Sequence, residues 1–115
     1  MSESNGNAKT YIADGYTIRV SIDPVTNLHS GLKFEFRPMT PRKVSQYLTQ
    51  KSGANASQDR EIQAKFIEEY VSQWSLSNGD GKQIPVSKDA VLDHMNPAVS
   101  VELFEIVAGF SNPPQ

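Results

Sequence analysis

Alternation of apolar and polar residues marks two stretches in the first third of the chain. Every second residue is apolar from Tyr16 to Ile22, and residues 32–36 repeat the pattern. Successive side chains of a strand point to opposite faces, so each stretch predicts a strand with one buried face. Strands adjacent in sequence usually pair, and a two-stranded ribbon is only marginally stable in water. We therefore expect an antiparallel ribbon whose apolar face is covered by other elements.

A longer apolar period follows and predicts helices. Thr40-Pro41 is a typical helix start, because threonine accepts a hydrogen bond from a free backbone N–H and proline fits the first turn. The clearest helical stripe begins at Asp59 and ends at Trp74, after a small and polar stretch, residues 52–58, that predicts a loop. The apolar members of this stripe are Ile62, Phe66, Ile67, Tyr70, Val71 and Trp74. We expect this helix to carry much of the core.

The last third of the chain predicts a turn and further helices. Residues 78–81, Asn-Gly-Asp-Gly, are typical of a turn, since glycine and asparagine tolerate positive φ angles. Ser87 and Asn96-Pro97 are helix-start signals, and Gly109 is typical of a helix end. The order of two strands and then three to four helices predicts an α+β domain, with helices on one face of a small antiparallel sheet.

The length of 115 residues suits one small domain, which we expect to span residues 11–110. Residues 1–10 are polar and lack an apolar period, which predicts a disordered leader. Residues 111–115 contain consecutive prolines and predict a flexible tail. No apolar run approaches the ~20 residues that cross a bilayer, so we expect no membrane association.

Charge is distributed unevenly along the chain, whose formal net charge is −2. Residues 1–56 carry seven basic and four acidic side chains, whereas residues 57–115 carry four basic and nine acidic ones. A dipolar domain favours a protein partner, because complementary charge steers and selects association. A small nucleic-acid-binding regulator that uses Arg37, Arg42 and Lys43 is an alternative, although these side chains fall short of the dense basic face that phosphate binding normally needs.

Residues that could carry catalysis or hold a cofactor are sparse. The chain has no cysteine, and His29 and His94 lie far apart in sequence, whereas zinc sites use three or four ligands, often in short-spaced pairs. The turn at Asn78 lacks the later oxygen ligands of a calcium loop. No phosphate-binding glycine loop or nucleophile elbow occurs. We expect a protein that is not an enzyme, with no catalytic, cofactor-binding or metal-binding residues and no cofactor.

Four segments follow one another in an order that is informative. Residues 32–40 form a strand that runs through Arg-Pro-Met-Thr into a helix, and residues 71–76 end the long helix at a tryptophan. Residues 81–87 are a glycine turn followed by Pro-Val-Ser, and Asn96-Pro97 precedes the last helix. Together these segments resemble the small tail assembly chaperones and related short tail-region proteins of bacteriophages. The longer N-terminal ribbon departs from that family pattern and leaves the strand count and any homo-oligomer open.

The resemblance implies a non-enzymatic, protein-binding function in the cytoplasm of the bacterial host. Such chaperones bind the long tape measure protein and keep its hydrophobic helical segments soluble during tail assembly. We expect Tyr47 and Phe104, at the edge of the apolar stripes, and Phe110, near the chain end, to contact the partner. A structural virion component, such as a tail-completion or head–tail joining protein, is the first alternative.

Overall fold

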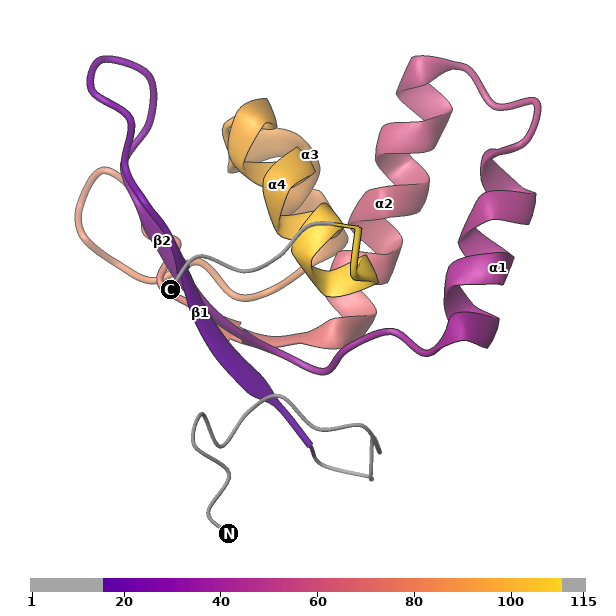
Figure 1. Ribbon diagram of the computed structural model, residues 1–115. Coiled ribbons are helices and arrows are strands. Elements are labelled where there is room, and N and C mark those ends of the chain that lie inside the picture. Colours follow the sequence, from indigo (N-terminus) through magenta and orange to yellow (C-terminus); the bar gives the residue numbers. More distant parts are fainter. Residues whose placement is uncertain (1–15, 111–115) are drawn as a thin grey trace, which may run out of the picture.

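A three-stranded antiparallel sheet and four helices make up residues 16–110, the part of the chain that the computed structural model describes. Figure 1 shows the helices together on one side of the sheet, which confirms the α+β class. The leader and the tail that we expect at residues 1–10 and 111–115 lie outside the described residues.

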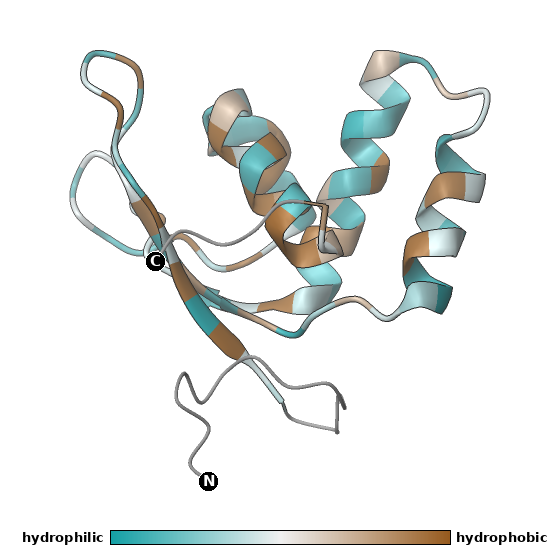
Figure 2. Ribbon diagram, in the orientation of Figure 1, coloured by the Kyte–Doolittle hydropathy of each residue, from teal (hydrophilic) through white to brown (hydrophobic). Residues whose placement is uncertain are grey.

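The predicted ribbon is present. Strand β1 (Ile18–Ile22) pairs antiparallel with β2 (Leu32–Phe36), in a register that puts Val20 opposite Phe34. Directly opposite residues share a face, so the apolar side chains of both strands point toward the helices and the polar ones point outward. Figure 2 shows this alternation of hydrophobic and hydrophilic positions along the ribbon.

A third strand occupies the segment that we expected to end the long helix. Helix α2 (Ala56–Tyr70) stops before Val71, and β3 (Val71–Trp74) pairs antiparallel with the second edge of β2. A spacing of three between Val71 and Trp74 is typical of a helix face. Here a β-bulge supplies the extra residue, so that both side chains are buried in a strand. The prediction of a helix through Trp74 is wrong, because this segment instead satisfies the backbone groups on the second edge of β2.

Three helix starts confirm the predicted caps. In each case a side-chain oxygen accepts a backbone hydrogen bond from the first turn: Thr40 before α1 (Pro41–Lys51), Ser87 before α3 (Lys88–His94) and Asn96 before α4 (Pro97–Ala108). The turn at Asn78 is also as predicted, since its Oδ1 accepts from the backbone N–H groups of Asp80 and Lys82. These signals are local, which is why the sequence alone reveals them.

The start of α2 departs from the prediction. It lies inside the stretch that we interpreted as a loop, because Asn55 and Gln58 form a capping box. The side chain of Asn55 accepts from the N–H of Gln58 at 2.8 Å, and the Gln58 side chain accepts from the N–H of Asn55 at 3.0 Å. The helix therefore begins at Ala56 rather than at Asp59.

The core lies between the sheet and the helices. Its most deeply buried large side chains are Ile22, Phe36, Tyr47, Ile67, Leu103, Phe104 and Val107. Trp74 extends this core past β3, because its Nε1 donates to the carbonyl of Ile84 at 2.6 Å. That bond holds the segment between β3 and α3 close to the sheet. Gln83 of this segment lies beside the face of the sheet that points away from the helices.

Candidate protein-binding surfaces

Phe110, the last residue that the structure describes, is fixed by the end of α4. Gly109 has a left-handed conformation with φ of 83° and donates its N–H to the carbonyl of Ile106, while the N–H of Phe110 donates to the carbonyl of Glu105. These two bonds form a Schellman motif, in which the residue after the glycine packs back on the helix. The ring of Phe110 accordingly lies 6.2 Å from that of Phe104. Half of Phe110 stays exposed, so a partner can reach it.

Tyr47 and Phe104, which we expected to contact a partner, lie in the core instead. Each is 1% exposed, and their ring centroids are 4.6 Å apart. The prediction is wrong for both, because α1 turns Tyr47 inward against Phe66 of α2 and Phe104 of α4. Leu48, the next residue along α1, is half exposed in its place. Of the three expected contact residues, only Phe110 is accessible.

The hydroxyl of Tyr47 is held by polar groups of α2. It donates to Oδ1 of Asp59 and accepts from Nε2 of Gln63 at 3.1 Å. Burial raises the pKa of Tyr47 to about 12; the bond from Gln63 opposes this rise and the Asp59 carboxylate adds to it. Tyr47 therefore stays neutral near neutral pH, and its ring packs against those of Phe104 and Phe110.

Two accessible residues adjoin the ring of Tyr47, and we call them the Phe110 patch: Lys51 and Phe110. The ring of Phe110 lies 6.3 Å from that of Tyr47, and the Nζ of Lys51 lies 5.8 Å from the centroid of the same ring. The patch is therefore apolar with one cationic border.

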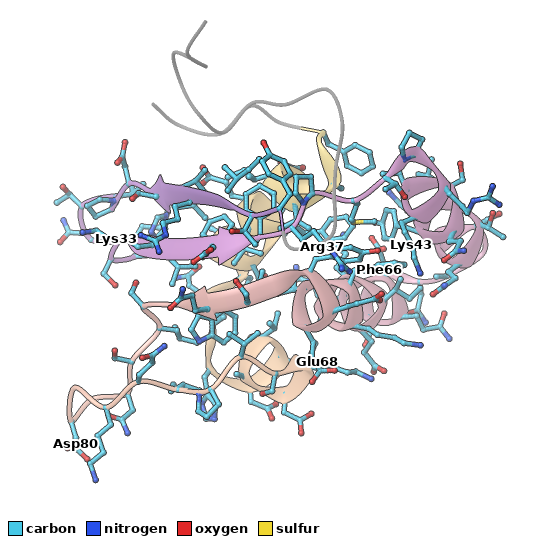
Figure 3. All side chains as sticks on the ribbon, turned by 90° about the horizontal axis from the view of Figure 1, so that it is seen from below. Lys33, Arg37, Lys43, Phe66, Glu68 and Asp80 are labelled. Atoms are coloured by element: carbon cyan, nitrogen blue, oxygen red, sulfur yellow. The ribbon has the colours of Figure 1, made fainter. Side chains whose placement is uncertain are left out.

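The outer face of the sheet carries a second surface, an open groove of about 510 Å³. Figure 3 views the molecule from this side and labels Lys33 on β2. The polar side chains of the groove include Arg19, Ser21, Lys33, Glu35, Gln73 and Gln83. They come from all three strands and from the chain that follows β3.

Glu35 supplies the carboxylate of this groove, and neighbouring side chains already donate hydrogen bonds to both of its oxygens. Its Oε2 accepts from the hydroxyl of Thr17 at 2.5 Å, and its Oε1 accepts from Nε2 of Gln73 at 2.5 Å and from Nε of Arg19 at 3.3 Å. These bonds, that of Thr17 foremost, lower the pKa of Glu35. Its side chain is 16% exposed, whereas that of Arg19 is 81% exposed. The negative charge is thus recessed and the positive charge projects.

The other sequence candidates are dispersed. The Nδ1 of His29 lies 2.9 Å from the carbonyl oxygen of Ser30, and His94 is exposed at the end of α3. Within residues 16–110, no group of three His, Asp or Glu side chains is placed to hold a metal ion. Oδ1 of Asn78 accepts two backbone hydrogen bonds within its own turn.

The three cations of the nucleic-acid alternative are partly engaged by the protein itself. The guanidinium of Arg37 lies 4.8 Å from the centroid of the Tyr70 ring, and the Nζ of Lys43 lies 3.8 Å from a carboxylate oxygen of Glu69. Arg42 is exposed. These contacts reduce the positive charge that the three side chains could direct at a phosphate backbone.

Comparison with known proteins yields no relative: no family model, no curated protein and no solved structure matches the chain. Among the helices of residues 16–110, none combines the length and the apolar character needed to cross a membrane.

Proposed function

We propose that this protein binds other proteins without catalysing a reaction, as a phage or prophage tail assembly chaperone in the bacterial cytoplasm. Its partner would be the tape measure protein, whose hydrophobic helical segments need cover while the tail forms. The order of the four family-like segments supports the family, although residues 71–74 form a strand rather than a helix end. The Phe110 patch supports the binding function.

The observation that carries the proposal is an exposed aromatic ring held in place before a partner arrives. Phe110 is half exposed, yet Phe104 and Tyr47 support its ring from below. Aromatic side chains often dominate the binding energy of protein interfaces, and an anchor that is already ordered loses less conformational entropy on association. Lys51, at the border of the patch, suits an acidic side chain beside the apolar face of an amphipathic helix.

Co-expression tests the proposal. The protein is produced together with a hydrophobic fragment of the tape measure protein from the same phage or prophage, and the soluble share of the fragment is measured. We expect the wild-type protein to raise that share and Phe110→Ser to lose most of the effect. Val25→Ser is the matched control, because Val25 is 47% exposed but lies in the loop between β1 and β2.

Two results would count against the proposal. A fragment that stays insoluble beside the wild-type protein contradicts the chaperone function, and equal activity of the Phe110 and Val25 variants contradicts the role of the patch. Thermal unfolding of each variant establishes that both are folded. Purified particles separate the structural alternative, since a virion component is retained in them and a chaperone is absent from them.

A further inference from the structure

We infer that the groove on the outer face of the sheet binds an extended segment of a partner protein that carries carboxylates at alternate positions. The inference goes beyond the proposed function, because the groove lies on the opposite side of the sheet from the helices that carry the Phe110 patch. Each surface can therefore be tested without the other.

The charges that project from the groove are positive. Arg19 is largely exposed, and among residues 16–110 it bonds Glu35 through its Nε alone, which leaves its terminal guanidinium N–H groups available to a ligand. In residues 16–110 the ammonium of Lys33 has no acidic partner. Glu35 is recessed and already accepts three hydrogen bonds. A ligand therefore meets two cations, and complementary charge favours a carboxylate-bearing one.

The spacing of these two cations matches an extended chain. Arg19 is paired with Glu35 and Ser21 with Lys33, so Arg19 and Lys33 are diagonal neighbours on one face. Such neighbours lie about 7–8 Å apart. In an extended segment, side chains two positions apart share a face at about 6.6 Å, from a rise of roughly 3.3 Å per residue. Carboxylates at alternate positions can thus reach both cations at once.

Neutral groups in the groove suit a peptide backbone. Gln73 gives an Nε2 hydrogen bond to Glu35, and Gln83 gives one to the carbonyl of Trp74. Within the described part of the chain their side-chain carbonyl oxygens have no donor, so both can accept from backbone N–H groups of a ligand. The aromatic residues Phe34 and Trp74 are 3% and 4% exposed, so the groove lacks the stacking platform on which a sheet usually binds nucleic-acid bases.

Calorimetric titration at low ionic strength tests the inference with a synthetic probe. The probe is an acetylated and amidated nonapeptide in which glutamate alternates with threonine, and its control has glutamine in place of each glutamate. We expect the glutamate peptide to bind and the glutamine peptide to bind about tenfold more weakly. Exposed ion pairs contribute up to about 1 kcal/mol each, so Arg19→Gln and Lys33→Gln should each weaken binding about three- to fivefold.

Lys65→Gln is the matched variant, because it removes the same charge from an exposed position on α2. The Lys65→Gln variant should bind the glutamate peptide like the wild-type protein. Phe110→Ser should also bind it normally, although we expect that variant to lose most of its solubilising effect in the co-expression test. Equal binding of the two peptides, or equal weakening by Lys65→Gln and Lys33→Gln, overturns the inference. Competition by inorganic phosphate or by single-stranded oligothymidylate at the concentration of the peptide overturns it as well, since the groove would then be a general anion or nucleic-acid site.

Discussion

The hydroxyl of Tyr47 donates a hydrogen bond of 2.8 Å to Oδ1 of Asp59, which joins the middle of α1 to the first turn of α2. Tyr47→Phe keeps the ring and removes this bond together with the one from Gln63. Because the acceptor is charged and the contact is partly buried, we expect the free energy of unfolding to fall by about 1–2 kcal/mol. Urea denaturation measures the change, and an unaltered midpoint would show that water replaces the bond without loss.

Acid should weaken the sheet through Glu35. Its pKa is lowered in the folded protein, so its contribution to stability is complete above the ordinary value of 4.5 and is lost as the pH falls through the folded value. The difference in unfolding free energy between the wild-type protein and Glu35→Gln should therefore be largest near neutral pH and shrink below pH 4.5. Denaturation at a series of pH values tests this. A difference that is constant with pH contradicts it.

The glycine at the end of α4 is required by its backbone conformation. Gly109 has a φ of 83°, at which a side chain costs about 1–2 kcal/mol, so Gly109→Ala should destabilise the fold by that amount. Gly79→Ala is the matched control, because Gly79 lacks a positive φ and has open space where a Cβ would lie. Thermal unfolding of both variants is the measurement, and equal melting temperatures would refute the requirement.

The capping box at the start of α2 predicts a local loss of stability. Asn55→Ala removes the side-chain acceptor for the N–H of Gln58 and should cost about 1 kcal/mol. Ser57→Ala changes an exposed residue in the same turn and should stay within about 0.5 kcal/mol of the wild-type protein. Denaturant unfolding compares the two; a cost that is the same for both would mean that the box contributes nothing.

Local signals in the sequence predict much of this fold. The caps at Thr40, Ser87 and Asn96 act within one turn of chain, so residue type alone reveals them. Val71 and Trp74 could not be assigned in this way. Their spacing fits a helix equally well, and the bulge that buries both in a strand depends on the distant edge of β2.

The candidate binding residues also divide into those that local sequence predicts and those that depend on distant segments. Phe110 was predicted from its place near the chain end, but the periodicity of α1 does not say which of its apolar residues meets a neighbour. Tyr47 is the residue of α1 that packs against α2 and α4, and Leu48 stays exposed. The positions of α2 and α4 decide which side of α1 is buried. The outer groove could not be predicted at all, since one of its walls belongs to β3 and the chain that follows it.

The two neighbours of β2 come from different distances along the chain. β1 precedes it by one loop, whereas β3 follows only after α1 and α2. Contacts between remote segments form late, because the entropy of closing the intervening chain is lost before the contacts compensate for it. During synthesis, the edge of β2 that β3 later covers therefore stays unpaired until the ribosome has released Trp74.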